Sequence, residues 1–256
     1  MNPAYLNIPA SLCFYAIRMK CLGQFQLYCW LKTTCSGHFK LTNQLMFSAY
    51  KELEINRQTL NNRLKWLLKN KWIGLNSKSG NYHLNSFKVI HRRTKSKTQT
   101  SIIWDGYDFK RFNAFVYAAI FLTVARSKWW IDQHRIKEKG RRPQRVGMLK
   151  RHSRLYPGFR SYSLPLAYLA KAIGVPIPTV GRMKAEAIKK GFIESTHQLK
   201  KIEIESSQIS TYRKYIDKPE KTVVRYNMLF EQLPDMITPF VVAKKRCNLK
   251  QNKLKI

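Results

Sequence analysis

The stretch SLPLAYLAKAIGVPIPTVGRMKAEAIKKGFI, residues 163–193, decides how the rest of the chain is interpreted. Its first half spaces apolar residues three and four apart, as on one face of a helix: Leu166, Leu169, Ala170 and Ile173. Ser163 is a candidate cap for this helix, and Pro165 suits its first turn. Gly174 is expected to end it, because glycine readily adopts the left-handed conformation found there.

A second helix is expected to begin at Pro178, after a turn of about three residues. Its predicted inner face is Val180, Met183, Ala187 and Ile188. Its predicted outer face is Thr179, Arg182, Ala185, Glu186 and Lys189. Two short helices joined by a tight turn, the second with a polar and basic outer face, form the helix-turn-helix pattern.

The segment LAKAIGVPIPTVGRMKAEAIKKGFI resembles the winged-helix family of helix-turn-helix DNA-binding domains. The resemblance rests on LA, IG, a short turn, TV-x-R and a closing GFI that would open a β-hairpin wing, over about thirty residues. It implies DNA binding through the helix from Pro178 to Lys190. The alternatives are a helical subdomain without a ligand and a protein-interaction module.

The pattern occurs a second time when the chain is shifted by 120 residues, without a gap from about Met46 to Ile73. The shift predicts helices from Thr42 to Leu53 and from Asn56 to Asn70, with Asn56 as a cap. The second of these turns four leucines inward: Leu60, Leu64, Leu67 and Leu68.

The outer face of that helix carries side chains able to pair with base edges: Arg57, Gln58, Asn61, Asn62 and Lys65. With Thr179 and Arg182, these are the candidate base-reading residues. A solvated helix face is the competing interpretation, but the concentration of amides with few acids favours DNA.

The chain has 256 residues with 48 Lys and Arg against 14 Asp and Glu, a formal net charge of +34. Such an excess repels itself unless a polyanion neutralises it, and nucleic acid is the natural partner. An anionic membrane surface competes, but no amphipathic anchor is evident. A merely soluble basic protein is a poor explanation at this magnitude.

We expect an α+β protein that is mainly α, with small β-hairpin wings and two winged-helix domains in tandem. The expected parts are a first domain (1–87), a basic linker (88–104), a second domain (105–230) with a basic insertion (134–160), and a basic C-terminal tail (231–256). Early helices are expected at Pro9–Lys20 and Gln24–Thr34, and a short strand at His38–Leu41. The first wing follows Ile73.

The second wing is expected to have a turn at Ser195–Gln198 and a strand at Lys200–Glu205. Cations on the wings, linker, insertion and helix ends are candidate phosphate contacts. They are Lys69, Lys78, Arg92, Arg93, Arg141, Arg142, Arg145, Lys150, Arg151, Arg154, Lys189 and Lys200.

Five cysteines without CxxC spacing favour a reducing compartment over a zinc site. The N-terminus lacks a secretory pattern, and the most apolar run, Phe112–Val124, is too short to span a bilayer and is expected as a buried helix. We therefore expect a cytoplasmic, nucleoid-associated protein of a bacterial host.

Enzyme motifs are absent from the sequence: there is no Walker-type loop, HxH pair, HExxH or His-x-x-Arg. Asp105 and Asp108 are the one candidate catalytic pair, but Asp108 is better placed to cap a helix near Phe109. We expect no enzymatic activity, catalytic residue, metal, cofactor, small-molecule substrate or membrane partner.

The sequence favours a sequence-specific binder of double-stranded DNA, either alone or as a homodimer. The organisation resembles plasmid and phage replication initiators and transcriptional regulators of mobile elements. We favour a phage or mobile-element regulator, with an initiator that binds origin repeats as the alternative. A protein that binds DNA or RNA without sequence preference is the second alternative.

Overall fold

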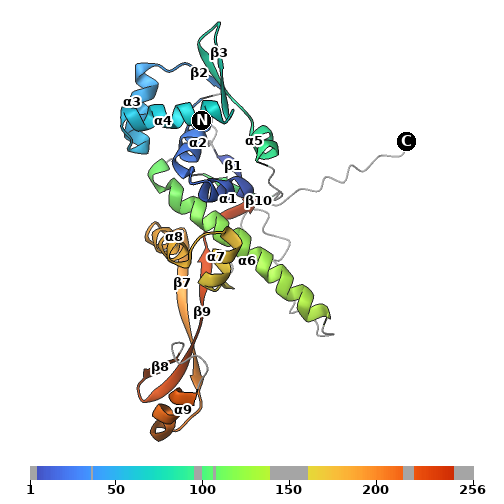
Figure 1. Ribbon diagram of the computed structural model, residues 1–256, viewed down its shortest axis with the longest axis vertical. Helices are drawn as coiled ribbons and strands as arrows, with labels where there is room; N and C mark the ends of the chain where they lie inside the picture. Colours follow the sequence, from blue (N-terminus) through green and yellow to red (C-terminus); the bar gives the residue numbers. More distant parts are fainter. Residues whose placement is uncertain are drawn as a thin grey trace, which may run out of the picture. The chain divides into compact units, whose positions relative to one another are not determined.

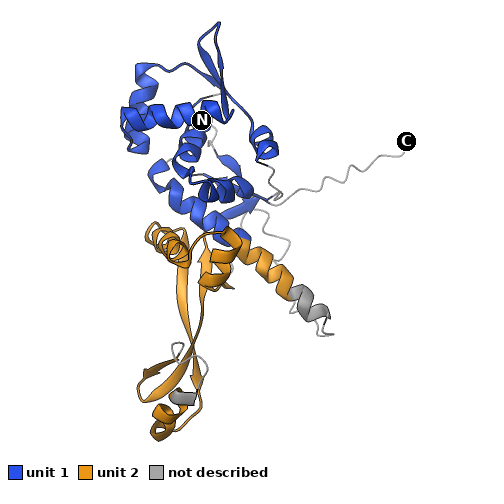
Figure 2. Ribbon diagram, in the orientation of Figure 1, with its two compact units in different colours: residues 1–123, 241–256 blue, residues 124–240 orange. Residues whose placement is uncertain are grey.

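The computed structural model describes residues 5–35, 37–94, 100–105, 108–138, 161–215 and 222–244. For residues 133–138 and 214–215 it describes the backbone alone. In these residues the chain is a mixed α+β protein with three small antiparallel sheets (Figure 1). It divides into two units, one of residues 1–123 and 241–256 and the other of residues 124–240 (Figure 2). The division falls within one helix, α6 (Phe112–Glu138).

Unit 1 begins with β1 (Leu6–Pro9), α1 (Ala10–Arg18) and α2 (Leu22–Thr34). Strand β5 (Ser101–Trp104) lies between β1 and β10 (Val242–Lys244) in an antiparallel sheet. Residues 242–244, which we expected in a basic tail, therefore pair with a strand about 140 residues earlier. Local patterns contain no information about a partner so distant, which is why the sequence did not indicate it.

The core of unit 1 is rich in aromatic residues. Trp72 has ring contacts with Phe25, Tyr28 and Trp66, with centroids 5.3–5.9 Å apart. Trp104 and Phe115 lie 4.7 Å apart at their ring centroids. These large apolar rings give the unit much of its buried area, the main favourable contribution to folding.

The second sheet of unit 1 has the order β2-β4-β3, formed by β2 (His38–Phe39), β4 (Asn81–Leu84) and β3 (Ile73–Asn76). Helices α3 (Asn43–Leu53) and α4 (Arg57–Lys69) lie between β2 and β3 in the chain. Both have side-chain caps: Thr42 accepts from the Leu45 amide, and Asn56 accepts from the Thr59 amide at 2.8 Å. The two helices, the Asn56 cap and the short strand before them confirm those predictions to within a few residues.

The stretch expected as a linker contains regular structure. Helix α5 (Phe87–Arg93) is capped by the side chain of the preceding Ser86, and it buries Ile90 completely. Strand β5 follows at the centre of its sheet. The basic composition hid these elements, because one buried side chain in a seven-residue helix leaves no apolar period to read.

Unit 2 contains β6 (Tyr162–Ser163), α7 (Leu166–Ile173), α8 (Ile177–Lys189) and two long strands, β7 (Ile193–Ile202) and β9 (Met228–Pro239). The sheet order is β6-β9-β7. Strands β7 and β9 form an extended ribbon, with η2 (Ser206–Gln208), α9 (Ile209–Tyr215) and β8 (Thr222–Arg225) towards its far end (Figure 1). Strand β8 joins β9 through a tight turn at Tyr226 and Asn227, both with positive φ.

Three local predictions in unit 2 need correction. Ser163 lies in β6 and does not cap α7, whose N-terminal boundary is Pro165 without a side-chain cap. Residues 195–198 belong to the continuous strand β7 and do not form a turn, because pairing with β9 continues on both sides of a register shift between Thr196 and Gln198. Residues 231–239, expected in the tail, belong to β9, the central strand of the sheet.

The helix that follows β5 also differs in detail. Asp108 caps the short helix η1 (Phe109–Arg111), with its carboxylate 3.0 Å from the Lys110 amide, so its capping role is confirmed. The apolar run of α6 is buried, as expected. Residues 112–123 nevertheless belong to unit 1, whereas we expected all of this helix in the second domain.

Candidate nucleic-acid interface

Helices α4 and α8 occupy equivalent positions in two segments of the same element order. Each segment runs strand, helix, helix, strand, with a later strand between the first and the last in the sheet. The shift of 120 residues superposes the boundaries of α4 (57–69) on those of α8 (177–189), and the first residue of β3 (Ile73) on that of β7 (Ile193).

The backbone repeats at both ends of these helices. The helix before each one ends on a left-handed residue, Glu54 with φ 51° and Gly174 with φ 81°. After each one, Lys71 and Gly191 are also left-handed, with φ 58° and 73°. Gly174 was expected to adopt this conformation, whereas Glu54 and Lys71 reach the same geometry without a glycine at either position.

The next residue in each segment is an aromatic that closes the helix onto the sheet. The Trp72 amide donates to the Leu67 carbonyl, and the Phe192 amide donates to the Ala187 carbonyl, both at 2.9 Å. The Trp72 carbonyl in turn accepts from the Asn85 amide, and the Phe192 carbonyl from the Phe240 amide. Both helices are therefore held on their sheets by the same set of backbone hydrogen bonds.

Burial separates two faces of α4. Leu60, Leu64 and Leu67 are buried, while Leu68 is only half-buried. All five candidate base-reading residues are exposed: Arg57, Gln58, Asn61, Asn62 and Lys65. Within the described residues, no hydrogen bond or ion pair engages these five side chains, so they are available to a ligand.

The Arg63 side chain of α4 contacts α2 of the same unit, and it was not among the predicted site residues. Its guanidinium donates to the Gln26 side chain at 3.2 Å, and that side chain donates to the Phe109 carbonyl at 2.7 Å. Burial lowers the pKa of Arg63. This chain of contacts fixes α4 on α2 and thereby orients its exposed face.

The outer face of α8 is only partly as expected. Arg182, Ala185 and Lys189 are exposed, whereas Thr179 and Glu186 are half-buried. Ile188, expected on the inner face, is 40% exposed. Lys184 is the reverse case, since it is 8% exposed although it was not assigned to the inner face.

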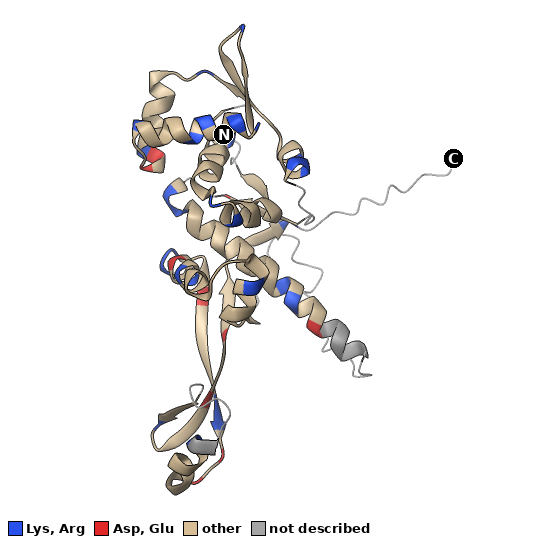
Figure 3. Ribbon diagram, in the orientation of Figure 1, with Lys and Arg blue, Asp and Glu red and all other residues tan. Residues whose placement is uncertain are grey.

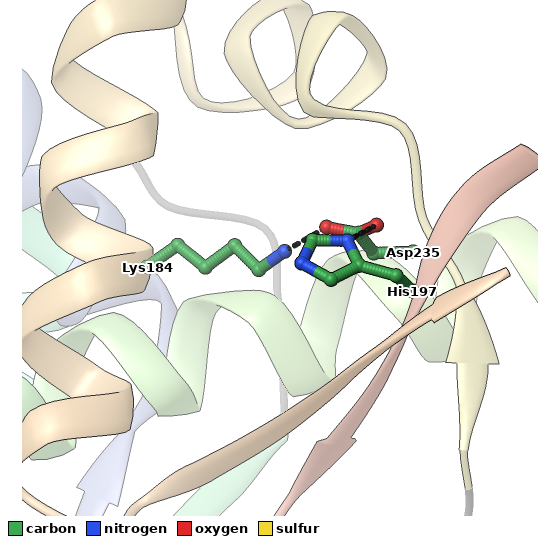
Figure 4. Close-up of polar contacts among 3 residues, drawn as sticks. All are labelled: Lys184, His197 and Asp235. Carbon is green, nitrogen blue, oxygen red and sulfur yellow. Dashed lines mark hydrogen bonds and ion pairs between the residues drawn. The ribbon is translucent and has the colours of Figure 1, made fainter. Parts of the chain in front are cut away.

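Lys184 is buried because β9 supplies a partner for its charge. Its ammonium group donates to one oxygen of Asp235, and the other oxygen lies 2.8 Å from Nδ1 of His197 (Figure 4). His197 is the residue of β7 at the register shift between β7 and β9, opposite Pro234 and Asp235. Burial by itself would raise the pKa of Asp235, but the hydrogen bonds from Lys184 and His197 outweigh burial and lower it.

The three residues Lys184, His197 and Asp235, here called the ribbon anchor, join α8 to both long strands. Sequence reasoning missed all three. The only available signal was that helical periodicity places Lys184 on the same face as Met183 and Ala187. Its partner lies 51 residues away, so no local pattern connects them.

The candidate phosphate contacts differ in whether their side chains are available to a ligand. Lys69, Lys78, Lys189 and Lys200 are exposed, as is Arg92. Lys78 lies in the turn between β3 and β4, where the Asn76 side chain accepts from the Lys78 and Ser79 amides. The guanidinium of Arg93 donates to the Lys71 carbonyl, so this side chain is already engaged within the protein.

Six of the predicted cations lie outside the described residues: Arg141, Arg142, Arg145, Lys150, Arg151 and Arg154. Where side chains are described, Lys and Arg recur along α4 and α8 and acids are sparse (Figure 3).

Two other kinds of site are absent from the described part of the chain. It contains no group of three or more His, Cys, Asp or Glu that could hold a metal ion. None of its helices combines the length and the apolar character needed to cross a bilayer.

Comparison with known proteins gives no match: no family model, curated protein or solved structure is similar to this chain at a significant level.

Proposed function

We propose that this protein binds double-stranded DNA through two winged-helix modules in tandem, with α4 and α8 as the helices that enter the major groove. The observation that carries the proposal is the equivalence of these two helices. Each is set on a sheet of the same strand order and exposes a face with cationic side chains. A helix held in this way presents its side chains to base edges as a rigid unit.

The formal net charge of +34 supports a polyanionic partner. The exposed cations on both helices and on the turn between β3 and β4 are suited to the backbone, where contacts fix position but carry no sequence information. The free amides of Gln58, Asn61 and Asn62 are suited to adenine edges, and Arg57 to guanine.

For the biological role, we favour a transcriptional regulator of a phage or other mobile element, without enzymatic activity. Two modules in one chain also suit a replication initiator that binds repeated origin sites, which is the alternative role. Selection of bound fragments from a random duplex pool tests the proposal. Repeated short sites near an origin would favour the initiator.

Competition binding against random duplex separates these roles from non-specific coating of DNA or RNA. A specific binder should prefer its selected site by about 10³-fold or more. Affinity should also fall roughly 10³- to 10⁵-fold between 50 and 200 mM salt if six to ten phosphates are contacted. Equal binding to all duplexes would refute the specific role.

Two substitutions connect the binding to the helices. Asn61→Ala and Arg182→Ala should relax base preference at separate positions of the selected site, each by roughly 1–3 kcal/mol. Gln208→Ala is the matched control, because it removes an exposed amide outside both helices. Equal losses from all three variants would contradict the assigned roles.

A further inference from the structure

The two equivalent helices present opposite kinds of chemistry at the same positions. The shift of 120 residues places Ile177 on Arg57, Pro178 on Gln58 and Gly181 on Asn61. It also places Arg182 on Asn62 and Ala185 on Lys65. The scaffold has therefore been kept while almost every outward side chain differs.

On α4 these positions carry hydrogen-bonding groups that form no hydrogen bond or ion pair with any other described residue. Amides and guanidinium groups pair in bidentate fashion with the N7 edges of adenine and guanine. This helix can therefore discriminate purines through directed hydrogen bonds.

On α8 the same positions carry apolar or small groups around a single cation. Ile177 is 49% exposed at the start of the helix, and Ala185 is exposed two turns later. Exposed aliphatic groups on a groove-binding helix pair with the methyl group of thymine, the one apolar feature of the major-groove edge. Arg182 remains as a hydrogen-bonding residue for guanine.

Gly181 is informative because no contact with the described residues requires a glycine there. A Cβ built there would meet no atom within 4 Å, and its backbone is in the ordinary helical region. Glycine in a helix interior is destabilising relative to alanine. A helix that lacks a side chain at this point can approach a groove more closely.

We infer that the two modules read unlike sequences: α4 reads purine edges by hydrogen bonds, and α8 reads thymine methyl groups at close approach with one arginine–guanine contact. The DNA site of one chain is then two dissimilar halves and not an inverted or direct repeat. This inference rests on the DNA binding proposed above and specifies its target.

The test is atom-level substitution in the duplex recovered by selection with the full-length chain. Deoxyuridine in place of thymidine removes only the methyl group, and 7-deazapurines remove only the N7 acceptor. Replacing a contacted purine should weaken binding roughly 5- to 150-fold, at several positions in the half read by α4 and at a single guanine in the half read by α8. Replacing thymidines should weaken it about four-fold per methyl group in the other half.

Protein variants assign each half to its helix. Ile177→Ala should abolish the response to deoxyuridine and leave the response to 7-deazapurine unchanged. Asn61→Ala should abolish the response to 7-deazapurine at one position of the other half and leave the response to deoxyuridine unchanged. Ile188→Ala is the matched control for Ile177→Ala, because it removes another exposed isoleucine of α8 outside the proposed contact positions. Gly181→Ala should weaken DNA binding without lowering the melting temperature of the free protein.

The outcomes separate the two proposals. A recovered site whose halves respond alike to both base analogues would overturn this inference and leave DNA binding intact. Failure to recover any preferred duplex would overturn the proposed function, and the inference with it.

Discussion

The ribbon anchor gives the sharpest test of the fold of unit 2, through the substitution Asp235→Asn. Side chains of Lys184 and Asp235 are 11% and 19% exposed, so the ion pair is largely removed from water. Removing one partner of a buried pair costs about 3–5 kcal/mol, because the other charge is left unpaired. Partial access of water to the carboxylate reduces our expectation to about 2–4 kcal/mol.

Lys184→Met should cost less, about 1–2 kcal/mol, because it removes the buried charge and keeps the aliphatic stem. The double variant should be more stable than the sum of the two losses predicts, with a coupling of roughly 1–3 kcal/mol. Hydrogen exchange of β7 and β9 amides is the suitable measurement, since tryptophan fluorescence combines signals from both units.

The control pair is Lys128 and Asp132, one turn apart on α6 and 2.6 Å from each other, with side chains 28% and 40% exposed. Asp132→Asn should cost only about 0.3–0.5 kcal/mol, as is usual for exposed helical pairs. Additive losses at Lys184 and Asp235, or a loss at Asp235 no larger than this control, would refute the claim that the anchor holds α8 to the ribbon.

The pH dependence has a definite sign. The pKa of Asp235 is lowered in the folded protein, so its stabilising contribution is fully present above the ordinary carboxyl pKa of about 3.9. That contribution is lost as the pH falls through the lower folded-state pKa. The stability difference between the wild type and Asp235→Asn should therefore shrink as the pH falls below about 4.

Three further predictions concern other parts of the chain. Gly181→Ala should raise the free energy of unfolding by about 0.5–1 kcal/mol, measured by urea denaturation, because the added methyl group meets open space in a helix interior. Trp72→Ala should cost about 3–5 kcal/mol of unfolding free energy in the same assay, because its aromatic contacts are lost. Phe47→Ala, at a side chain 69% exposed, should change stability by less than about 0.5 kcal/mol, and similar losses from the two variants would contradict the assigned core. Burial raises the pKa of the Cys13 and Cys29 thiols and raises that of Cys21 to about 11. Mass spectrometry after alkylation at pH 8 should therefore find these three cysteines unmodified until the protein unfolds, whereas the less buried Cys35 should react sooner.

Local sequence patterns were sufficient for the helices and their ends around the candidate interface. Leucines of α4 recur at helical spacing, Asn56 caps that helix, and Gly174 ends α7 in the left-handed conformation. The internal shift of 120 residues also predicted that α4 and α8 would be equivalent. These features depend on residues within a few positions of one another, so their physical causes are present in any short window of the chain.

Tertiary structure alone decided which distant segments pair and what they bury. Strand β9 pairs with β7 although η2, α9 and β8 lie between them in the chain. Strand β10 pairs with β5, which lies much earlier in the sequence. The burial of Lys184 follows from β9, because a lysine is tolerated there only when Asp235 comes within hydrogen-bonding distance. Periodicity assigns a side chain to a face of its own helix, but the charge and hydrogen-bond partner that make burial favourable come from chain folded far away in sequence.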